Sequence, residues 1–387
     1  MLILDQSAIK VNNRKRILRL LSEQRELTKQ DIARILDISI PTVSTIVAEL
    51  IVEGILEEAG IASSTGGRKP IILRFIPTSY FSLGVDLCED FVRVILTDLD
   101  STILKDVKVQ IEDLDFNNLL DIIKSTVKEI LKDSHIEISK VLGLGISLPG
   151  IVNNMELKLD IAPNFNLREL DFKPLKAELN IPIFIENEAN AGALGEAILG
   201  IAKEMDNLIY ISITEGIGGG IIFKQEVHRG RNSKAGEIGH MTIDKFGKVC
   251  SCGKKGCWET TASKRALIKY YEELTSAKVK NIKIIFDKYK MGEDEAFKAL
   301  EIYSEELAIG IQNLIYIFNP DYIVIGGEIS RYEDILLPLL EKKIFSECHL
   351  YNSSDVKLLF AKLKEDSNIL GASLMPITEA FGFNNIM

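Results

Sequence analysis

From residue 77 onward, short apolar segments that are typical of β-strands alternate with segments that are typical of α-helices. One predicted helix carries its apolar residues between Leu119 and Leu131 on a single face, a second covers residues 189–199 and is rich in small residues, and a third is long, at about residues 294–318. The predicted strands lie at residues 83–87, 91–96, 141–147, 183–185, 208–213, 221–223 and 322–325. Because strands alternate with helices throughout, we predict the α/β class for this part of the chain.

Glycine-containing turns follow three of the predicted strands. Pro149-Gly150 follows the strand at 141–147, a glycine-rich turn at 215–220 separates two apolar strands, and Gly326-Gly327 follows the strand at 322–325. Glycine lets backbone amides approach a phosphate or a sugar closely, and α/β proteins bind ligands at the carboxyl ends of their strands. Each turn alone carries little weight, because such turns are common.

The charge of the chain is divided unevenly between its two ends. The 387 residues have a net charge of −10 and predict two or three domains, because they are too many for one compact core. Residues 1–80 have 11 basic and 9 acidic residues, a net +2, which leaves −12 for the rest. Five basic residues, from Lys10 to Arg19, have no acid between them. This pattern hints at a head that binds a polyanion, although basic faces are usually just solvated.

The first 76 residues have the pattern of a helix-turn-helix. Apolar residues at helical spacing predict helices at residues 10–23, 29–36 and 41–53, with a short polar break before the third and Gly54 ending it. The third helix begins at Pro41 and carries Thr42, Ser44 and Thr45 in its first turns. The small hydroxyl groups of these three residues can reach base edges and phosphates. We predict a DNA-reading helix here; the alternative is an ordinary three-helix bundle.

Two short apolar strands after this third helix predict a β-hairpin. They flank a loop, residues 60–70, whose tip contains Gly67, Arg68 and Lys69. A basic, glycine-bearing tip directly after a helix-turn-helix is typical of the wing of a winged helix, where its cations meet DNA phosphates. The alternative is a solvated loop.

Three of the five cysteines lie within eight residues of one another. Cys250, Cys252 and Cys257 supply three thiolates, and His240 stands ten residues upstream, whereas Cys88 and Cys348 stand alone. A Cys3His set suits tetrahedral Zn²⁺ with a structural role. A disulfide and free thiols are the alternatives.

Six strings together resemble the ROK family of repressors, open reading frames and sugar kinases. They are Gly-Ile-Ser-Leu-Pro-Gly at 145–150, Glu-Asn-Glu-Ala-Asn-Ala at 186–191, Glu-Gly-Ile-Gly-Gly-Gly at 215–220, Gly-Glu-Ile-Gly-His at 236–240, Cys-Ser-Cys-Gly-Lys-Lys-Gly-Cys at 250–257 and Ile-Gly-Gly at 325–327. The resemblance implies two lobes of the actin-like, ribonuclease-H-like fold with a sugar in the cleft between them. A winged helix ahead of this body is the arrangement of the family's repressors. The resemblance is greatest to its xylose-responsive repressors, which implies xylose as the sugar.

The resemblance also implies the residues that bind the sugar and strengthens the zinc prediction. By position within the family's motifs, the sugar-binding residues are Asn187, Glu188, Glu237, His240 and Glu259. Carboxylates accept hydrogen bonds from sugar hydroxyls, whereas asparagine can both accept and donate. The zinc would be held by His240 and the three clustered cysteines.

Three departures from the family pattern argue against a sugar kinase. The family's catalytic base is an aspartate, and this chain has Glu188 there. The first phosphate loop lacks its glycines and reads Asp86-Leu87-Cys88-Glu89-Asp90, and the second has Thr214-Glu215 in place of a Gly-Thr pair. The added acids would repel a triphosphate, and the longer glutamate moves the base out of position.

We therefore expect a sugar-responsive repressor that is not an enzyme. The alternatives are an ATP-dependent sugar kinase with a DNA-binding head, and a repressor controlled by a protein partner. The expected domains are a winged helix (1–76), a first lobe (77–188) to which a C-terminal helix (about 366–387) returns, and a second lobe with the zinc loop (189–365). We expect a cytoplasmic protein, because the start lacks the pattern of a signal peptide and the longest apolar run, residues 141–152, is too short to span a bilayer. We also expect a homodimer on a palindromic operator, because helix-turn-helix repressors read two half-sites as symmetric dimers.

Overall fold

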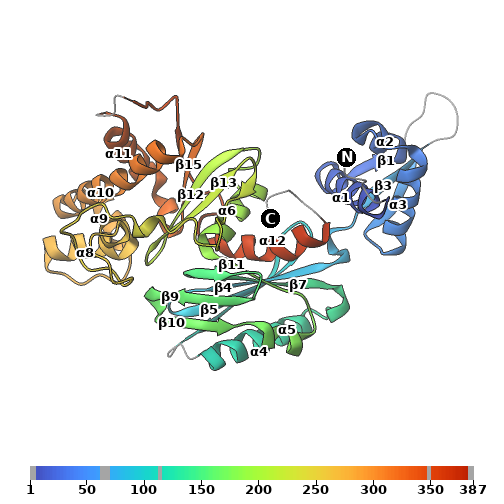
Figure 1. Ribbon diagram of the computed structural model, residues 1–387, viewed down its shortest axis with the longest axis horizontal. Helices are drawn as coiled ribbons and strands as arrows, with labels where there is room; N and C mark the ends of the chain where they lie inside the picture. Colours follow the sequence, from blue (N-terminus) through green and yellow to red (C-terminus); the bar gives the residue numbers. More distant parts are fainter. Residues whose placement is uncertain (1–5, 62–69, 112–115, 347–349, 382–387) are drawn as a thin grey trace.

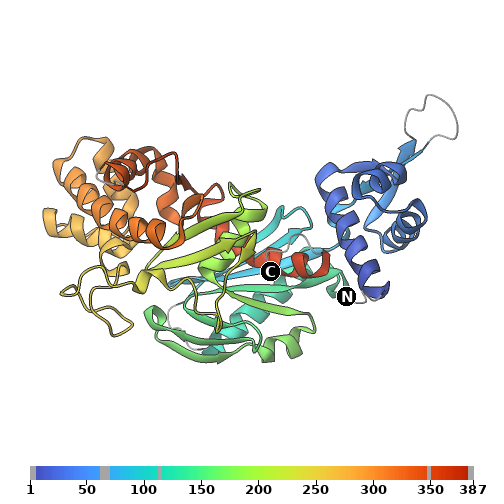
Figure 2. The same cartoon turned by 45° about the horizontal axis from the view of Figure 1, so that its top comes forward.

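The computed structural model describes residues 6–61, 70–111, 116–346 and 350–381. A small N-terminal head stands beside a larger body that consists of two lobes (Figure 1). Seen after a 45° turn, the head remains set apart from the second lobe and adjoins the first (Figure 2). Within the described residues, no helix combines the length and the apolar character needed to cross a membrane.

Three helices and one antiparallel sheet form the head. They are α1 (Gln6–Gln24), α2 (Lys29–Leu36), α3 (Ile40–Val52), β1 (Glu26–Thr28), β2 (Leu56–Ile61) and β3 (Ile71–Phe75), with the strand order β1-β3-β2. Thr28 caps α2 through a reciprocal capping box with Asp31, and the Ser39 hydroxyl accepts a hydrogen bond from the Thr42 amide at 3.4 Å to cap α3. The helix-turn-helix predicted from these residue types is therefore present.

The basic residues of α1 are used mainly to hold the head together. Lys10 pairs with Glu49 of α3 at 2.6 Å, Arg14 pairs with Glu53 at 2.9 Å, and Arg16 donates to a backbone oxygen at the end of α2 at 2.7 Å. These contacts join α1 to α2 and α3 and so help to hold the head together. They leave the expectation that the head binds a polyanion unchanged.

The first lobe is a five-stranded sheet with helices on both faces and a small second sheet. Its main sheet has the order β11-β7-β4-β5-β6. The elements are β4 (Phe81–Leu87), β5 (Phe91–Asp98), β6 (Ile103–Gln110), β7 (Val141–Leu148), β11 (Ile183–Asn187), α4 (Phe116–Asp133), α5 (Lys173–Leu179) and the small sheet of β8 (Ile151–Asn153), β9 (Lys158–Ala162) and β10 (Leu167–Asp171). Helices α4 and α5 cover one face, and α12 (Ser367–Phe381) crosses the other (Figure 1).

The second lobe repeats this sheet topology. Its order is β14-β13-β12-β15-β16. In each lobe the first strand, β4 or β12, pairs antiparallel with the next strand of the chain on one side, and two parallel pairings lie on its other side. The elements are β12 (Asn207–Ile213), β13 (Ile217–Phe223), β14 (Glu226–Val227), β15 (Tyr322–Gly326), β16 (Lys357–Phe360), α6 (Glu188–Ile198), α7 (Glu259–Ala262), α8 (Lys264–Thr275), α9 (Ile282–Lys290), α10 (Asp294–Phe318) and α11 (Glu333–Phe345). The matching order of the two sheets is the two-lobed arrangement that the resemblance implied.

The glycines at 218–220 do not form the turn expected between two strands. They lie inside β13, which begins at Ile217, and the turn is confined to Thr214–Gly216. A Cβ atom on Gly220 would lie 2.5 Å from the backbone oxygen of Ala189 in α6. These small residues therefore let α6 pack closely on the sheet.

Two helices, α6 and α12, pack against each other where the two lobes meet. The buried Glu196 carboxylate of α6 accepts a hydrogen bond from the Ser367 hydroxyl at 2.8 Å and another from the Leu363 amide at 2.8 Å. Helix α12 also lies on β4 and β7, where the Ser82 hydroxyl donates to the Ser373 backbone oxygen at 2.6 Å. The chain therefore returns to the first lobe after completing the second.

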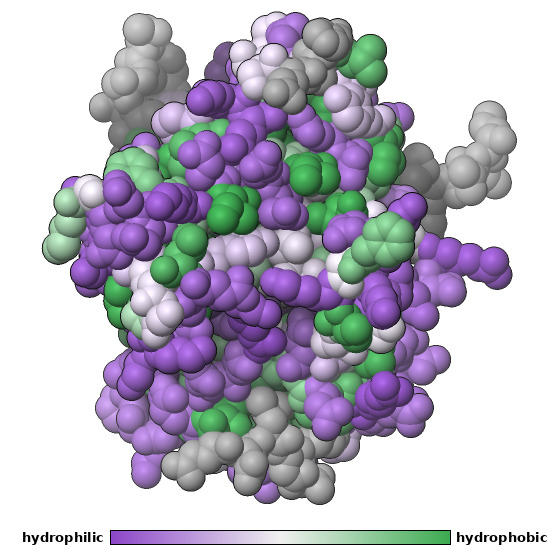
Figure 3. All heavy atoms as spheres, turned by 90° about the vertical axis from the view of Figure 1, so that its left-hand side faces the viewer, coloured by the Kyte–Doolittle hydropathy of each residue, from purple (hydrophilic) through white to green (hydrophobic). Residues whose placement is uncertain are grey.

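Helices α8 to α11 form the outer side of the second lobe. Exposed apolar side chains on these helices include Ile284, Phe297, Ile302 and Ile309. On the face that this side of the molecule presents, apolar side chains are interspersed with polar ones (Figure 3). Such single apolar side chains are normal on a solvent-facing surface.

Candidate functional site

A cavity of about 540 Å³ lies between the two lobes, within the size range of small-molecule sites. All five residues that the resemblance assigns to sugar binding line it: Asn187, Glu188, Glu237, His240 and Glu259. They come from separate elements, namely the β11–α6 junction, the segment of Glu237 and η4 (Ile238–His240), and the start of α7. The fold therefore brings together polar groups that are up to 72 residues apart in the chain.

Asn187 ends β11 and caps α6. Its side-chain oxygen accepts from the amides of Ala189 at 2.9 Å and Asn190 at 3.3 Å, and its Nδ2 donates to the Gly150 oxygen at 2.8 Å. An asparagine amide has two N–H groups, so one donor remains for a ligand. The cap fixes where the next residue, Glu188, points.

Glu188 is the first residue of α6 and lies on the cavity wall. Its Oε1 is 3.5 Å from the hydroxyl of Thr214, which lies in the turn after β12 and donates to it. The pKa of Glu188 is raised to about 8, chiefly by burial and also by the neighbouring carboxylates of Asp86, Glu237 and Glu215, against the effect of the Thr214 hydrogen bond. At pH 7 this side chain is therefore mostly a neutral carboxylic acid, which can donate as well as accept a hydrogen bond.

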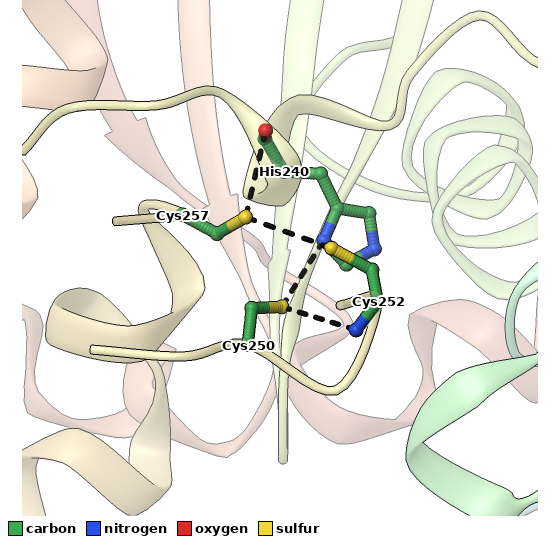
Figure 4. Close-up of side chains that lie close together, drawn as sticks. All are labelled: His240, Cys250, Cys252 and Cys257. Carbon is green, nitrogen blue, oxygen red and sulfur yellow. Dashed lines mark hydrogen bonds between the residues drawn. The ribbon is translucent and has the colours of Figure 1, made fainter. Parts of the chain in front are cut away.

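Glu237 and His240 are held against β13 by a glycine turn. Gly236 has a φ of +92°, and a Cβ atom there would lie 2.0 Å from the Gly219 oxygen, so other residues would be strained at this position. The following 3-10 turn places His240 Nε2 3.7 Å from Glu237 Oε2 on the cavity side. The other ring nitrogen, Nδ1, points at the cysteine cluster (Figure 4).

His240, Cys250, Cys252 and Cys257 gather around one point, and their ligand atoms all lie within 4.8 Å of one another (Figure 4). His240 Nδ1 is 3.6 Å from Cys250 Sγ, and Cys252 Sγ is 3.7 Å from Cys257 Sγ. A tetrahedral zinc with bonds of about 2.3 Å to sulfur and about 2.0–2.1 Å to nitrogen places such pairs about 3.6–3.8 Å apart. The four side chains therefore fit a metal ion without rearrangement of these two pairs.

The cysteine loop is closed by a backbone hydrogen bond and is anchored to the rest of the lobe by the residue that follows it. Cys250 N donates to Lys254 O at 2.8 Å within the loop, and the fully buried Trp258 that follows it donates from its indole nitrogen to Glu306 O of α10 at 3.0 Å. The buried Glu259 accepts from the Cys250 thiol at 2.8 Å. Glu259, which lines the cavity, is thus in direct contact with the cysteine cluster.

The first predicted phosphate loop has become a β-hairpin that carries acidic residues. Asp86 is buried in β4, and Glu89 lies in the β4–β5 turn. In the second loop, Glu215 accepts a hydrogen bond from Arg265 at 2.9 Å and pairs with Lys264. The cationic groups at this end of the cavity are thus already paired with carboxylates, and a phosphate would have to displace those carboxylates.

Helix α3 carries the residues that we predicted to read DNA, and they differ in their exposure. Val43, Ile46, Val47 and Leu50 are buried, whereas Thr45 and Pro41 are exposed and Thr42 and Ser44 are half-buried. The Thr45 hydroxyl donates to the Pro41 oxygen at 3.1 Å. The wing residues Gly67, Arg68 and Lys69 lie outside the described residues.

Asn164 also lines the cavity, although no motif in the sequence marks it as a site residue. Asn164 lies in η3 (Pro163–Phe165) of the first lobe, accepts from the Ser251 hydroxyl at 2.6 Å and donates to Glu259 Oε2 at 3.5 Å. It therefore connects the first lobe to the cysteine loop. A Pro-Asn pair after a short strand was the available signal, but the pair gives no indication of its distant partner.

Two family models match the chain, one over the two-lobed body and one over the head. The model described as ROK family matches residues 82–379, and a model described as winged helix-turn-helix DNA-binding matches residues 12–57. The chain belongs to the ROK family. The winged helix places it with the members of this family that have a DNA-binding head.

Relatives of known name share nearly the whole length of this ROK protein. The xylose repressor of Bacillus subtilis (strain 168) is 33% identical over 380 residues, which cover 97% of each chain. The DNA-binding transcriptional dual regulator NagC of Escherichia coli (strain K12) is 26% identical over 345 residues, which cover 87% of this chain and 85% of NagC.

Solved structures agree with the two-part architecture. A crystal structure of a ROK family transcriptional regulator, described as a homolog of the E. coli MLC protein, has a TM-score of 0.84 and 26% identity, covering 97% of this chain and 98% of that chain. A ROK family glucokinase from Streptomyces griseus in complex with glucose and AMPPNP has a TM-score of 0.68 and 26% identity, but covers 76% of this chain and 98% of its own. The kinase therefore matches a shorter part of this chain than the regulator does.

Proposed function

We propose that this ROK protein is a sugar-responsive transcriptional repressor whose effector is a monosaccharide, and that this monosaccharide is xylose. The observation that carries the proposal is that one chain joins a winged helix to a polar cavity, over the full length that it shares with a named xylose repressor. Of the two alternatives, control by a protein partner does not explain the polar cavity. The kinase alternative is disfavoured because Glu89 and Glu215 stand at the end of the cavity where phosphates would bind.

In this proposal the five polar residues of the cavity recognise the sugar. Glu237 and Glu259 accept hydrogen bonds from its hydroxyls, Asn187 supplies its remaining N–H, and Glu188 and His240 contact further hydroxyls. Polar groups that only a hydroxylated ligand can satisfy select strongly against ligands that lack those hydroxyls. We propose no catalytic role for any of them.

We further propose that His240, Cys250, Cys252 and Cys257 hold a structural Zn²⁺. Their atom spacing and their chemistry support this ion, because three sulfurs and one imidazole are the ligands that zinc prefers. When bound, the ion would fix the ring of His240 and so the direction of Nε2 toward the cavity. The zinc would thus stabilise one wall of the sugar pocket.

Helix α12 offers a direct route from the cavity to the head. Near its start, Asn368 lines the cavity, and near its end, Ile377 is fully buried in a core shared with Ile17 and Leu21 of α1. We propose that sugar binding changes lobe closure, shifts α12 and so moves the head. The domain boundaries at 76/77 and 188/189, with the C-terminal helix returning to the first lobe, are part of the same proposal.

We also propose that two copies act together on DNA. Helix-turn-helix repressors read two half-sites with matching symmetry, so a homodimer on a palindromic operator is the expected assembly. A change in lobe closure would then alter the spacing of the two heads.

The decisive experiment measures sugar binding and operator release without nucleotide. We expect xylose to raise the melting temperature of the purified protein in the absence of ATP, because a ligand selective for the folded state stabilises it. Xylose should also change the affinity for operator DNA in a gel-shift assay, whereas an unrelated monosaccharide should have little effect. Sugar-dependent ADP release, or no response to any monosaccharide, would contradict the proposal.

The two parts of the head should contribute differently to DNA binding. Replacing Arg68 and Lys69 by alanine should weaken binding to all sequences and reduce the slope of log K against log salt by about two, because two phosphate contacts are lost. Replacing Thr42 or Thr45 should instead alter which sequences bind, by about tenfold at the contacted base pair. Gel shifts over a salt series measure both, with Lys278→Ala on the body as the control. Unchanged affinity and slope in the first variant would remove the wing from the interface.

A further inference from the structure

We infer that Arg265 is a positioning residue that holds the two lobes together over the cavity, and that it does so through carboxylates in the two segments that match the phosphate loops of the family's kinases. The inference deepens the proposed function, because it assumes that the cavity binds a sugar. It adds a device that allows the cleft to close without a nucleotide.

The contacts of Arg265 span the cleft. It is the second residue of α8 in the second lobe, and its Nη2 donates to Glu89 Oε1 at 2.5 Å. Glu89 lies in the β4–β5 hairpin of the first lobe, 176 residues earlier in the chain. This ion pair therefore joins the two lobes and can form only when the hairpin and the start of α8 are close together.

The other contacts of Arg265 hold its guanidinium in place. Its Nε donates to Glu215 Oε2 at 2.9 Å, and the second oxygen of Glu215 pairs with the neighbouring Lys264. Lys264 also lies 3.7 Å from Glu328 at the end of β15. The second lobe thus orients Arg265 before it meets Glu89, which lowers the entropy cost of the pair.

The balance of charge at this cluster favours lobe closure over anion binding. Three carboxylates (Glu89, Glu215 and Glu328) face two cations (Lys264 and Arg265), which leaves one net negative charge. Glu89, Glu215, Lys264 and Glu328 all line the cavity. An incoming phosphate would meet repulsion and would compete with contacts that the cations already make.

The size of the expected effect follows from the exposure of the pair. The side chains of Arg265 and Glu89 are each 44% exposed, and ion pairs at that exposure contribute modestly. A pair that exists only in the closed form adds to the affinity of any ligand that binds the closed form. We therefore expect a loss of sugar affinity of about three- to fivefold when the pair is removed.

Calorimetric titration of xylose into the full-length protein tests the inference. Arg265→Gln and Glu89→Gln should each weaken sugar binding about three- to fivefold, and the double variant should be no weaker than Arg265→Gln alone, because both changes remove one pair. High salt should weaken sugar binding to the wild type more than to the variants. Lys269→Gln is the matched control, because Lys269 lies on the same helix and pairs with Glu273 within the second lobe.

Small-angle scattering of the sugar-free proteins gives a second measurement that does not depend on the ligand. Removal of the pair should increase the radius of gyration of Arg265→Gln and Glu89→Gln relative to Lys269→Gln. The inference would be overturned if the two variants had the same radius of gyration as Lys269→Gln. It would also be overturned if they bound xylose as tightly as the wild type, or if the double variant showed the sum of the two single effects. Failure of the wild type to bind any sugar would instead count against the proposed function, and the scattering result would still decide the role of Arg265.

Discussion

Replacing Cys252 by serine is expected to abolish zinc binding and to weaken xylose binding by about ten- to a hundredfold. Cys252 Sγ stands 3.7 Å from Cys257 Sγ in the cluster, so its loss removes one of four ligands. Without the ion, the ring of His240 is no longer held from its Nδ1 side, and a positioned hydrogen bond of about 1–3 kcal/mol to the sugar is lost. Metal analysis of protein purified without chelators and under reducing conditions, followed by calorimetry, measures both effects.

The control for this experiment is the same change in a cysteine outside the cluster. Cys88 lies in the first lobe just after β4, so Cys88→Ser should keep its zinc. Wild-type protein without zinc would contradict the metal proposal. A Cys252→Ser protein that loses zinc but keeps full sugar affinity would contradict the proposed connection between the metal and the pocket.

Replacing Glu188 by alanine is expected to weaken sugar binding by about a hundredfold and to remove the effect of the sugar on operator binding. The carboxyl group lies at the cavity wall, and its loss leaves a sugar hydroxyl and Thr214 without a buried partner. Calorimetry and a gel-shift titration with xylose measure the two effects. Neither the wild type nor the variant should release ADP in the presence of sugar and ATP.

The outcome of the Glu188 experiment separates a sensor from an enzyme. Phosphoryl transfer depends almost wholly on positioning and on stabilisation of charge, and this cavity places acids where those functions need cations. Sugar-dependent turnover that disappears in Glu188→Ala would support the kinase alternative. Glu226→Ala, a change at an exposed carboxylate of β14, is the matched control and should behave as the wild type.

A sensor of this kind needs a connection between its ligand and its DNA-binding part. Here the first turn of α12 reaches the cavity and its last turn enters the core of the head. The cluster around Arg265 and the helix α12 have different roles in this scheme: the first favours closure of the lobes, and the second transmits it. A variant that alters closure should therefore change sugar affinity and operator release together.

Local signals in the sequence were sufficient to predict the features of this protein that depend on residues close together in the chain. The three helices of the head lie close to where the spacing of apolar residues predicted them, and the cysteine cluster closes around His240 because its three sulfurs lie within eight residues. The α/β class followed from the alternation of strands and helices. The five residues of the cavity came from the family motifs that carry the resemblance, rather than from their spacing.

Long-range pairing was decided by the tertiary structure. Asn164 with Ser251 and Glu89 with Arg265 are separated by 87 and 176 residues, and a charged or amide side chain gives no sequence signal of such a partner. The ion pairs of Lys10 with Glu49 and of Arg14 with Glu53 were also beyond the sequence, because it does not show that α3 lies beside α1. The glycines at 218–220 were placed in a turn for the same reason: the helix that packs on them, α6, is close only in the folded protein. Local propensity acts between neighbours in the chain, whereas these contacts form when two lobes and a head pack together.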